Sequence, residues 1–398
     1  MKIVLAYSGG LDTSVMIKWL KEHYSAEVIA CIVDVGQTDE NLNDIKRKAL
    51  KTGAVRAYLK DAKKEFAEQY IFRAVKSNAV YEGQYFLGTS LARPIIAAKI
   101  IEVAKQEKAD AVAHGATGKG NDQVRFELTF KALMPSIKII APWREWEMKS
   151  RQDEIDYAKK HGIPIPVTKA KPYSSDANMW HISYEGGILE NPENTYPEDM
   201  FQMTVSPERA PNKPTVIDIY FEKGIPTKIN GKRYTPVNLI NQLNKIGGKN
   251  GIGRSDCVEN RLVGMKSRGV YEAPAAVILY TAHRELESLT LDRETAHYKE
   301  ILAVKYSELA YYGQWYSLLK NSLDAFVDKT QENVTGSVKL KLYKGNCMIL
   351  GRKSAKSLYW EKLSTFEKED IYNQKDAEGF INLFGLPLKV EAIMRNRK

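Results

Sequence analysis

The stretch of the chain that is richest in chemical groups is AYSGGLDTS, residues 6–14, which follows the apolar run KIVL. It combines two glycines with the hydroxyls of Ser8, Thr13 and Ser14 and the carboxylate of Asp12. A glycine-rich turn between a strand and a helix presents backbone N–H groups at a helix N-terminus, where anions bind. We therefore expect this turn to bind phosphate groups, with the hydroxyls as additional donors.

The turn matches neither of two common phosphate-binding patterns. The pattern GxxxxGK(S/T) fails because no Lys follows the glycines, and GxGxxG fails because Gly9 and Gly10 are adjacent. Without a Lys to hold a transferring γ-phosphate, the turn suits a pyrophosphate that leaves intact. This predicts attack at the α-phosphorus, with Asp12 holding a metal ion or orienting a neighbouring N–H. The alternative is an ordinary helix-capping turn, which explains the complete string less well.

A second informative string is HGATGKGNDQVRFE, residues 114–127. Its polar members are Thr117, Lys119, Asn121, Asp122 and Arg125, and the last three occupy neighbouring positions on one helical turn. An amide, a carboxylate and a guanidinium together suit a zwitterionic amino acid, because its carboxylate binds Arg or an amide N–H and its ammonium binds Asp. The alternative is a solvated helix start.

Three weaker strings are YFLGTSLARP (85–94), KPYSSDANMWHISYEGGILENP (171–192) and CVENRLVGMKSRGVYEAPA (257–275). In the first, we expect Ser90 to cap a helix whose first turn contains Arg93. The second is dense in hydroxyl and aromatic side chains and is expected to be a loop. In the third, Glu259 and Tyr271 are polar residues in a structural run. Core or surface roles explain each of these residues when it is taken alone.

The elements that position these strings alternate regularly over the first 165 residues. Apolar runs predict strands at 2–7, 27–35, 55–59, 109–115 and 137–143, and helical patterns fall at 13–23, 41–52, 62–77, 91–108 and 120–133. This order predicts an α/β fold with a doubly wound parallel sheet. Such sheets bind ligands beyond the carboxyl ends of their strands. The stretches that follow the first, second and fourth predicted strands should therefore line the site. They are SGGLDTS, GQTDEN and ATGKGND.

The rest of the chain lacks this regular alternation of strands and helices. The predicted elements are a helix at 150–162, a loop-rich stretch at 170–225, strands at 215–224 and 226–230, a helix at 236–246, a glycine-rich turn at 247–253, helices to about 326 and a hairpin at 336–354 that turns at Lys344 and Gly345. The apolar tail, 376–398, has nothing local to cover it. We expect it to dock on another subunit.

Composition excludes further classes of protein. The 398 residues are 43% hydrophobic and 27% charged, and no apolar run is long enough to span a membrane. The first residues do not resemble a signal peptide, which predicts a cytoplasmic protein without membrane partners. Cys31, Cys257 and Cys347 lack metal-ligand spacing and are expected to be inert thiols. The net charge of +10 is shared evenly between residues 1–165 and the remainder, which argues against a nucleic-acid partner.

Together these strings resemble the argininosuccinate synthase family of N-type ATP pyrophosphatases, whose phosphate turn is the PP-loop. The resemblance rests on AYSGGLDTS, GTSLARP, HGATGKGNDQVRFE, IAPWR, HGIPIPVT, HISYEGGILENP and VENRLVGMKSRGVYE, and covers nearly the whole chain. It implies that ATP and citrulline form citrullyl-adenylate and pyrophosphate. Aspartate then displaces AMP to give argininosuccinate, with Mg²⁺ accompanying ATP, in arginine biosynthesis and the urea cycle.

The resemblance also implies roles for individual residues. ATP is expected at Ala6, Tyr7, Ser8, Gly9, Gly10, Leu11, Asp12, Thr13, Ser14, Val33 and Gly115; citrulline at Tyr85, Ser90, Asn121, Arg125, Ser174, Ser183, Glu259 and Tyr271; and aspartate at Thr117, Asn121 and Asp122. Asp12, Ser14 and Asp122 are the expected catalytic residues, and no protein-bound metal site is implied. Val33 and Tyr173 depart from the family, which often has a smaller residue and a Trp there. Val33 affects only the expected fit around the nucleoside.

The implied architecture has three parts. Residues 1–165 form a nucleotide-binding domain like the adenine-nucleotide α-hydrolases, residues 166–363 an α+β synthetase and multimerisation domain, and residues 364–398 an oligomerisation arm of a homotetramer. Other PP-loop enzymes act on tRNA, but the catalytic cysteine pair of the thiolases is missing. A glutamine-dependent amidotransferase needs an N-terminal Cys, and Lys2 stands there. A protein that only binds ATP or RNA has no need for two amino-acid pockets.

Overall fold

The computed structural model of the chain describes residues 1–37, 41–118, 120–164, 172–365 and 371–397. Lys119 and the expected domain boundary at 165 and 166 lie outside these ranges. The chain forms two compact units, Met1–Lys356 and Ser357–Lys398. One apolar core runs through much of the first unit and includes Val4, Ile95 and Leu279.

The first half of this unit is the predicted doubly wound α/β domain. Its elements are β1 (Lys2–Ala6), α1 (Leu11–Tyr24), β2 (Glu27–Asp34), α2 (Leu42–Thr52), β3 (Arg56–Asp61), α3 (Lys63–Glu65), the π-helical turn η1 (Phe66–Ile71), α4 (Phe72–Lys76), α5 (Gly88–Glu107), β4 (Ala111–Ala113), α6 (Asp122–Leu133), β5 (Lys138–Ile140), the 3₁₀ turn η2 (Pro142–Arg144) and α7 (Arg151–Lys160). The five strands are parallel in the order β3-β2-β1-β4-β5. The single helix predicted at 62–77 is divided by the π-helical turn.

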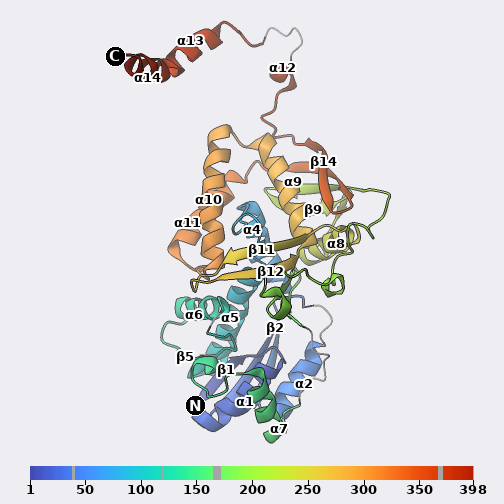
Figure 1. The fold of residues 1–398 in the computed structure, drawn as a ribbon, viewed down its shortest axis with the longest axis vertical. Helices are drawn as coiled ribbons and strands as arrows, with labels where there is room; N and C mark the ends of the chain where they lie inside the picture. Colours follow the sequence, from blue (N-terminus) through green and yellow to red (C-terminus); the bar gives the residue numbers. More distant parts are fainter. Residues whose placement is uncertain (38–40, 119, 165–171, 366–370, 398) are drawn as a thin grey trace. The chain divides into compact units, whose positions relative to one another are not determined.

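Both faces of this sheet are covered, which explains why its strands are continuously apolar. Successive side chains of a strand point to opposite faces. Ile3 and Leu5 of β1 pack in a core with α1 and α7, whereas Val4 and Ala6 pack in a core with α5. Figure 1 shows α1 and α7 together beside the sheet. The sheet is therefore a rigid platform whose loops can carry chemistry.

The strand order places two of the predicted site loops side by side. The chain leaves β1 for β2 and β3 on one side, and later returns to β4 and β5 on the other. The loops after β1 and β4 thus flank the switch point, where open α/β sheets bind ligands. Gly115, just after β4, confirms their closeness, because a Cβ there would lie 3.1 Å from Cγ2 of Thr13 in α1.

The second half of the unit contains two antiparallel sheets and a group of helices. Its elements are β6 (Ser174–Ala177), β7 (Ile182–Glu185), η3 (Gly187–Leu189), η4 (Glu198–Met200), β8 (Thr215–Glu222), β9 (Ile225–Ile229), β10 (Lys232–Arg233), α8 (Pro236–Lys249), β11 (Arg254–Asn260), β12 (Lys266–Glu272), α9 (Pro274–Thr290), α10 (Arg293–Tyr311), α11 (Leu318–Thr330), β13 (Gly336–Tyr343) and β14 (Asn346–Lys353). The sheets have the orders β11-β12-β7-β6 and β10-β9-β8-β13-β14. The hairpin predicted at 336–354 is confirmed as β13 and β14, and both residues of its turn have positive φ.

The prediction was wrong for the other antiparallel sheet. Strands β6 and β7 lie in the stretch expected to be a loop, and β11 and β12 lie where helices were expected. The physical reason is that polar side chains of β6, β7 and β11 face a cavity, which weakens the alternation of apolar and polar residues that marks a strand.

The second unit consists of helices α12 (Glu361–Ser364), α13 (Asp376–Phe384) and α14 (Leu386–Arg395). None of their described residues is buried, and Leu383 and Phe384 are 76% and 75% exposed. This unit therefore carries apolar side chains without a core of its own. Within the described ranges, no helix combines the length and the apolar character that a membrane span requires.

Candidate active site

A cavity of about 280 Å³ lies where the loop after β4 and the start of α6 meet the sheet that the prediction missed. Its walls come from five separate segments of the chain. They consist of Tyr85, Thr89, Arg93, Gly115, Ala116, Thr117, Gly120, Asn121, Asp122, Arg125, Asp176, Ser183, Tyr184, Glu185, Glu259, Arg261 and Tyr271. The cavity is lined by charged and hydroxyl groups and thus suits a small polar molecule rather than an apolar one.

Most of the residues expected to bind amino acids line this cavity. They are Tyr85, Asn121, Arg125, Ser183, Glu259 and Tyr271 from the citrulline set, and Thr117, Asn121 and Asp122 from the aspartate set. Gly115 of the ATP set lies at its edge. Glu259 and Tyr271, which sequence spacing alone could not connect to the others, reach it from β11 and β12.

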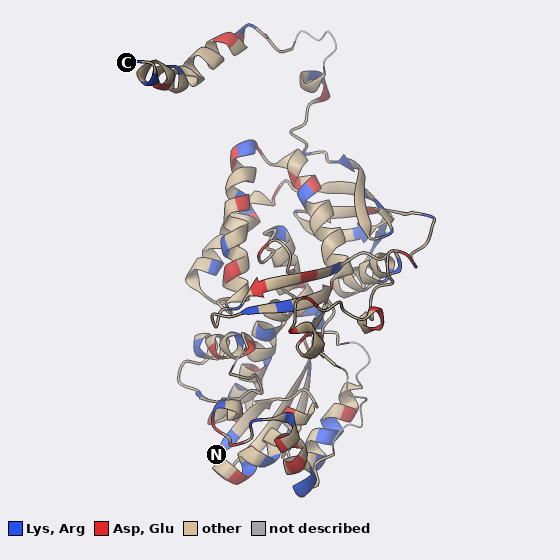
Figure 2. Cartoon of the chain, viewed as in Figure 1, with Lys and Arg blue, Asp and Glu red and all other residues tan. Residues whose placement is uncertain are grey.

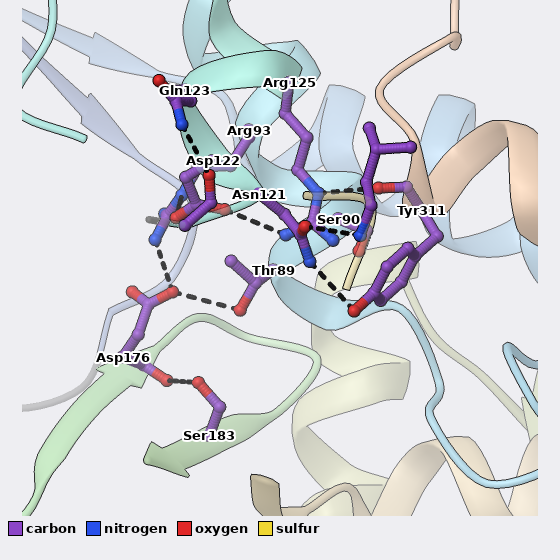
Figure 3. A network of polar contacts seen from close by, with 12 residues as sticks. Thr89, Ser90, Arg93, Asn121, Asp122, Gln123, Arg125, Asp176, Ser183 and Tyr311 are labelled. Carbon is purple, nitrogen blue, oxygen red and sulfur yellow. Dashed lines mark hydrogen bonds and ion pairs between the residues drawn. The ribbon is translucent and has the colours of Figure 1, made fainter. Parts of the chain in front are cut away.

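Asp122 is held between two arginines (Figure 3). Its Oδ2 accepts from Nε of Arg93 at 2.7 Å, and its Oδ1 accepts from Nη1 of Arg125 at 2.9 Å. Burial raises the pKa of the Asp122 carboxyl, but the two guanidinium groups outweigh burial and leave the pKa below its usual value. Asp122 is therefore a carboxylate at neutral pH and can attract an ammonium group.

Arg93 also ties this carboxylate to the missed sheet. Its Nη2 donates to Oδ2 of Asp176 on β6 at 2.6 Å, and the Thr89 hydroxyl donates to the same oxygen at 3.1 Å. Thr89 also lies 3.0 Å from Nε2 of His181. Burial and the two nearby arginines, Arg93 and Arg125, lower the pKa of His181 to about 3, so this imidazole is neutral.

Asn121 connects the start of α6 to two distant segments. Its Nδ2 donates to the Tyr311 hydroxyl at 2.9 Å, and its Oδ1 accepts from the backbone N–H of Leu262 at 2.9 Å. Arg125 donates through Nε to the Tyr311 carbonyl at 2.9 Å and lies over the Tyr311 ring, 4.8 Å from its centroid. The amide and the guanidinium are therefore fixed by α10 and the β11–β12 turn.

Glu259 lies between two phenols. The hydroxyls of Tyr271 and Tyr311 each donate to one of its carboxylate oxygens, and only 8% of the residue is exposed. Burial and the Glu259 carboxylate raise the pKa of both phenols, so they stay protonated donors. This arrangement places a carboxylate on the cavity wall, where it can accept N–H groups from a ligand.

The expectation that Ser90 caps a helix was wrong. Helix α5 begins at Gly88, so Ser90 lies inside its first turn and is fully buried. A Cβ on Gly88 would come 2.1 Å from Cδ2 of His181, which shows how closely this helix start packs against the loop before β7. Ser90 contacts the Tyr85 hydroxyl through its backbone N–H at 3.3 Å and thus supports a cavity residue from behind.

Ser174 is not among the residues that line the cavity. It is exposed on the edge strand β6, where it pairs with Glu185 of β7. Residues two apart on a strand share a face, so Ser174 is on the same face as Asp176, one step farther along. Its expected contact with citrulline remains a prediction.

The phosphate turn has the predicted strand–turn–helix form. Gly9 has φ +82°, and Gly10 precedes the first residue of α1. Ser8 and Thr13 hydroxyls lie 3.2 Å apart. Ser8 is exposed, whereas the fully buried Ser14 donates through Oγ to the Gly10 carbonyl at 2.7 Å. Ser14 lies one helical turn after Gly10, which favours this back-bond. Its expected contact with a phosphate remains a prediction.

Two more residues of the expected ATP set, Val33 and Tyr7, have buried side chains. Val33 is 4% exposed near the end of β2, and its carbonyl accepts from Nε2 of Gln37 at 2.9 Å. The Tyr7 hydroxyl lies 3.0 Å from Oγ of Ser14 and supports the turn from within the core. Contacts of these residues with a nucleoside or a phosphate remain predictions.

Sequence reasoning missed several residues at the site. Asp176, Glu185, Arg261 and Tyr311 were not proposed, and Arg93 was noted only as part of a helix. Burial raises the pKa of Glu185, partly offset by Arg261. Asp176 and Glu185 could have been found in the polar stretch at 171–192. Tyr311 carried no signal, since its neighbours read as an ordinary helix end.

Comparison with known proteins agrees with this geometry. A family model described as the Arginosuccinate synthase N-terminal HUP domain matches residues 2–164, and one described as the Arginosuccinate synthase C-terminal domain matches residues 173–391. Argininosuccinate synthase of Endomicrobium trichonymphae is 66% identical over 99% of this chain and 95% of the relative. The argininosuccinate synthase of Caldanaerobacter subterraneus is 63% identical over 99% of this chain and 96% of the relative. That of Acetivibrio thermocellus is 62% identical over 100% of this chain and 98% of the relative.

Proposed function

The chain belongs to the argininosuccinate synthase family, and from that membership we propose that it joins citrulline to aspartate at the expense of ATP in arginine biosynthesis. The observation that carries the proposal is the junction at Gly115. This residue packs against Thr13 of the phosphate turn and also lines the amino-acid cavity. A nucleotide held by the turn and an amino acid held in the cavity would therefore meet at the switch point.

In the first step, the ureido oxygen of citrulline attacks the α-phosphorus of ATP. The bond from that phosphorus to the bridging oxygen breaks, and pyrophosphate leaves. A neutral urea is a weak nucleophile, so we expect the protein to act by alignment and by stabilising charge. Gly9 and Gly10 would present backbone N–H groups to the departing pyrophosphate, and Ser14 would hold the turn through Gly10.

Citrulline fits the charges on the cavity wall. Its carboxylate would pair with Arg125, and its ammonium or ureido N–H groups would face Glu259 and the Tyr271 hydroxyl. Tyr85, held from behind by Ser90, and Ser183, whose Oγ donates to the Asp176 carbonyl at 3.4 Å, would complete the pocket together with Ser174. Burial raises the pKa of Tyr85 to about 12, although Arg125 opposes this, so Tyr85 acts as a neutral hydrogen-bond donor.

In the second step, the aspartate ammonium group loses a proton, the resulting amine attacks the activated carbon, and AMP leaves with the former ureido oxygen. Thr117, Asn121 and Asp122 would hold aspartate, with the Asp122 carboxylate facing its ammonium group. Asn121 borders both amino acids because it lies between Asp122 and the β11–β12 turn. Arg93 keeps the Asp122 carboxylate pointed into the cavity.

Mg²⁺ fits this site as an ion that arrives with the phosphates of ATP. Among the described residues, no three His, Cys, Asp or Glu side chains lie together as a metal site would require. Mg²⁺ is commonly held by substrate phosphates with few protein ligands. The exposed hydroxyl of Ser8 is the oxygen that the turn would offer, and the ion would neutralise the charge on the departing pyrophosphate.

We assign the assembly of the protein to its C-terminal arm. Residues 1–165 would bind the nucleotide, residues 166–363 would complete the amino-acid site, and residues 364–398 would hold together a cytoplasmic homotetramer. The exposed Phe380, Leu383 and Phe384 of α13 support this proposal, because apolar helix faces of this size usually meet a partner. Light scattering of a full-length Phe380→Glu, Phe384→Glu variant should show loss of the tetramer.

Pyrophosphate exchange tests the proposed reaction. Labelled pyrophosphate should enter ATP only when citrulline is present, and AMP should be released only when aspartate is added. Exchange that depends on tRNA instead would transfer the chain to the tRNA-modifying branch of the PP-loop enzymes. Figure 2 shows acidic and basic residues interspersed along the helices of the first unit, which does not favour such a partner.

A further inference from the structure

The phosphate turn receives a positive charge from a helix distant in sequence. Lys48 of α2 donates through Nζ to the carbonyl oxygen of Gly9 at 2.6 Å. One helical turn earlier, Ile45 packs against the same glycine, because a Cβ on Gly9 would lie 2.9 Å from Cγ2 of Ile45. Helix α2 thus brings a hydrophobic contact and an ammonium group to the turn from the same face.

Among the described residues, no carboxylate forms an ion pair with the ammonium group of Lys48. Among the residues that the structure describes, its recorded partner is the Gly9 carbonyl. Partial burial lowers the pKa of Lys48. A lysine ammonium has three N–H donors, so two remain after the bond to Gly9. Arg47, its neighbour on α2, differs because it pairs with Asp44.

The chemistry at this turn calls for such a charge. The turn has no Lys of its own, yet the departing pyrophosphate gains negative charge as its bond to the α-phosphorus breaks. A cation aimed at charge that develops in the transition state lowers the barrier. A lysine is a compact charge on a flexible stem and can reach a phosphate oxygen near the carbonyl that it now contacts.

We infer that Lys48 is a further catalytic residue, which binds the β- and γ-phosphates of ATP and stabilises pyrophosphate as it leaves. The inference rests on the proposed function, since it requires the turn to hold these phosphates. Lys48 would thus supply from α2 the positive charge that other phosphate-binding turns supply with a Lys in their own sequence.

The test compares two ligands of the full-length protein by calorimetry, each without turnover. Lys48→Met should weaken the binding of magnesium pyrophosphate about 10- to 100-fold, the range for losing a hydrogen bond to a charged group. Binding of AMP, which lacks the β- and γ-phosphates, should change less than about threefold on the same scale. Lys48→Arg should recover part of the pyrophosphate affinity, and Lys51→Met, a change at an exposed residue of α2, should leave both affinities unchanged.

Equal weakening of AMP and pyrophosphate would overturn the inference, because it would show that Lys48 only supports the shape of the turn. Unchanged pyrophosphate binding would overturn it as well. Citrulline-dependent exchange by the unmodified protein is measured separately. A failure of that assay, with pyrophosphate still bound through Lys48, would count against the proposed function alone.

Discussion

The phosphate turn and the amino-acid cavity achieve binding in different ways. The turn consists of consecutive residues and uses glycine backbone, with Gly9 at a positive φ and Ile45 packed against it. The cavity is lined by charged and polar side chains from segments between Tyr85 and Tyr271, some of them paired, such as Arg93 with Asp122. A binding site built from the backbone of consecutive residues can therefore be predicted from a short stretch of sequence. A site built from side chains of distant segments is assembled only when the chain folds.

The largest expected effect separates the two regions at Asp122. Asp122→Asn should reduce the aspartate-dependent release of AMP about 100-fold or more, because a charged partner of the substrate ammonium is lost. Citrulline-dependent pyrophosphate exchange at saturating citrulline should remain within about threefold of normal, since the amide oxygen of the variant can still accept from Nη1 of Arg125 and the turn is untouched. Rapid-quench measurement of both half-reactions checks this. Equal loss of both would remove Asp122 from its assigned role.

A glycine substitution tests the backbone side of the comparison. Gly9→Ala forces a side chain into a left-handed conformation and against Ile45, at a cost of roughly 1–3 kcal/mol. The KM for ATP should rise about tenfold or more, whereas calorimetric binding of aspartate should persist. Gly351→Ala in β14 is the matched control, because a Cβ there meets no atom within 4 Å and the residue lies outside the site. A normal KM in Gly9→Ala would show that the turn tolerates the strain.

Asp176 tests whether the missed sheet tunes the aspartate pocket. Asp176→Asn removes the charge that holds Nη2 of Arg93 and should raise the KM for aspartate about 3- to 10-fold. Pyrophosphate exchange should change little. Steady-state kinetics at saturating ATP and citrulline provide the measurement, with the exposed Asp156→Asn as control. An unchanged KM would reduce Asp176 to a structural residue of β6.

The smallest expected effect is on stability and comes from Glu154 of α7, which neighbours Asp12 of the phosphate turn. Glu154 is 2% exposed in α7, and its Oε1 has no hydrogen-bond partner among the described residues. Burial and the neighbouring carboxylate of Asp12 raise the pKa of Glu154 to about 8. The folded state therefore holds a proton that the unfolded chain releases above about pH 4.5, the ordinary pKa of a Glu carboxyl. This contribution to stability is present below pH 4.5 and is lost as the pH rises towards 8.

Glu154→Gln removes this pH dependence. The unfolding midpoint of the variant, relative to the unmodified protein, should rise by at least about 2 °C between pH 5 and pH 8. Differential scanning fluorimetry in buffer without metal ions or nucleotide gives the comparison. Glu147→Gln, at an exposed position, should show no such trend. A constant difference across this pH range would contradict a raised pKa of Glu154 in the folded state.

The features that could be predicted from the sequence are those set by consecutive residues, as in the phosphate turn. The parallel sheet, its covering helices, the β13–β14 hairpin and the strand–turn–helix form of residues 6–14 depend on local patterns and were predicted correctly. The β7 and β11–β12 strands were missed because their polar residues serve the cavity. The pairing of Asp122 with Arg93, of Glu259 with Tyr311 and of Lys48 with Gly9 joins residues that no local pattern relates.

The position of Tyr311 has a consequence for how the protein is made. All five strands of the parallel sheet lie within the first 165 residues, whereas Asn121 and Arg125 gain their support only when α10 has left the ribosome. The apolar core likewise joins Val4 of β1 to Leu279 of α9. The growing chain therefore cannot complete the amino-acid cavity until Tyr311 has been synthesised.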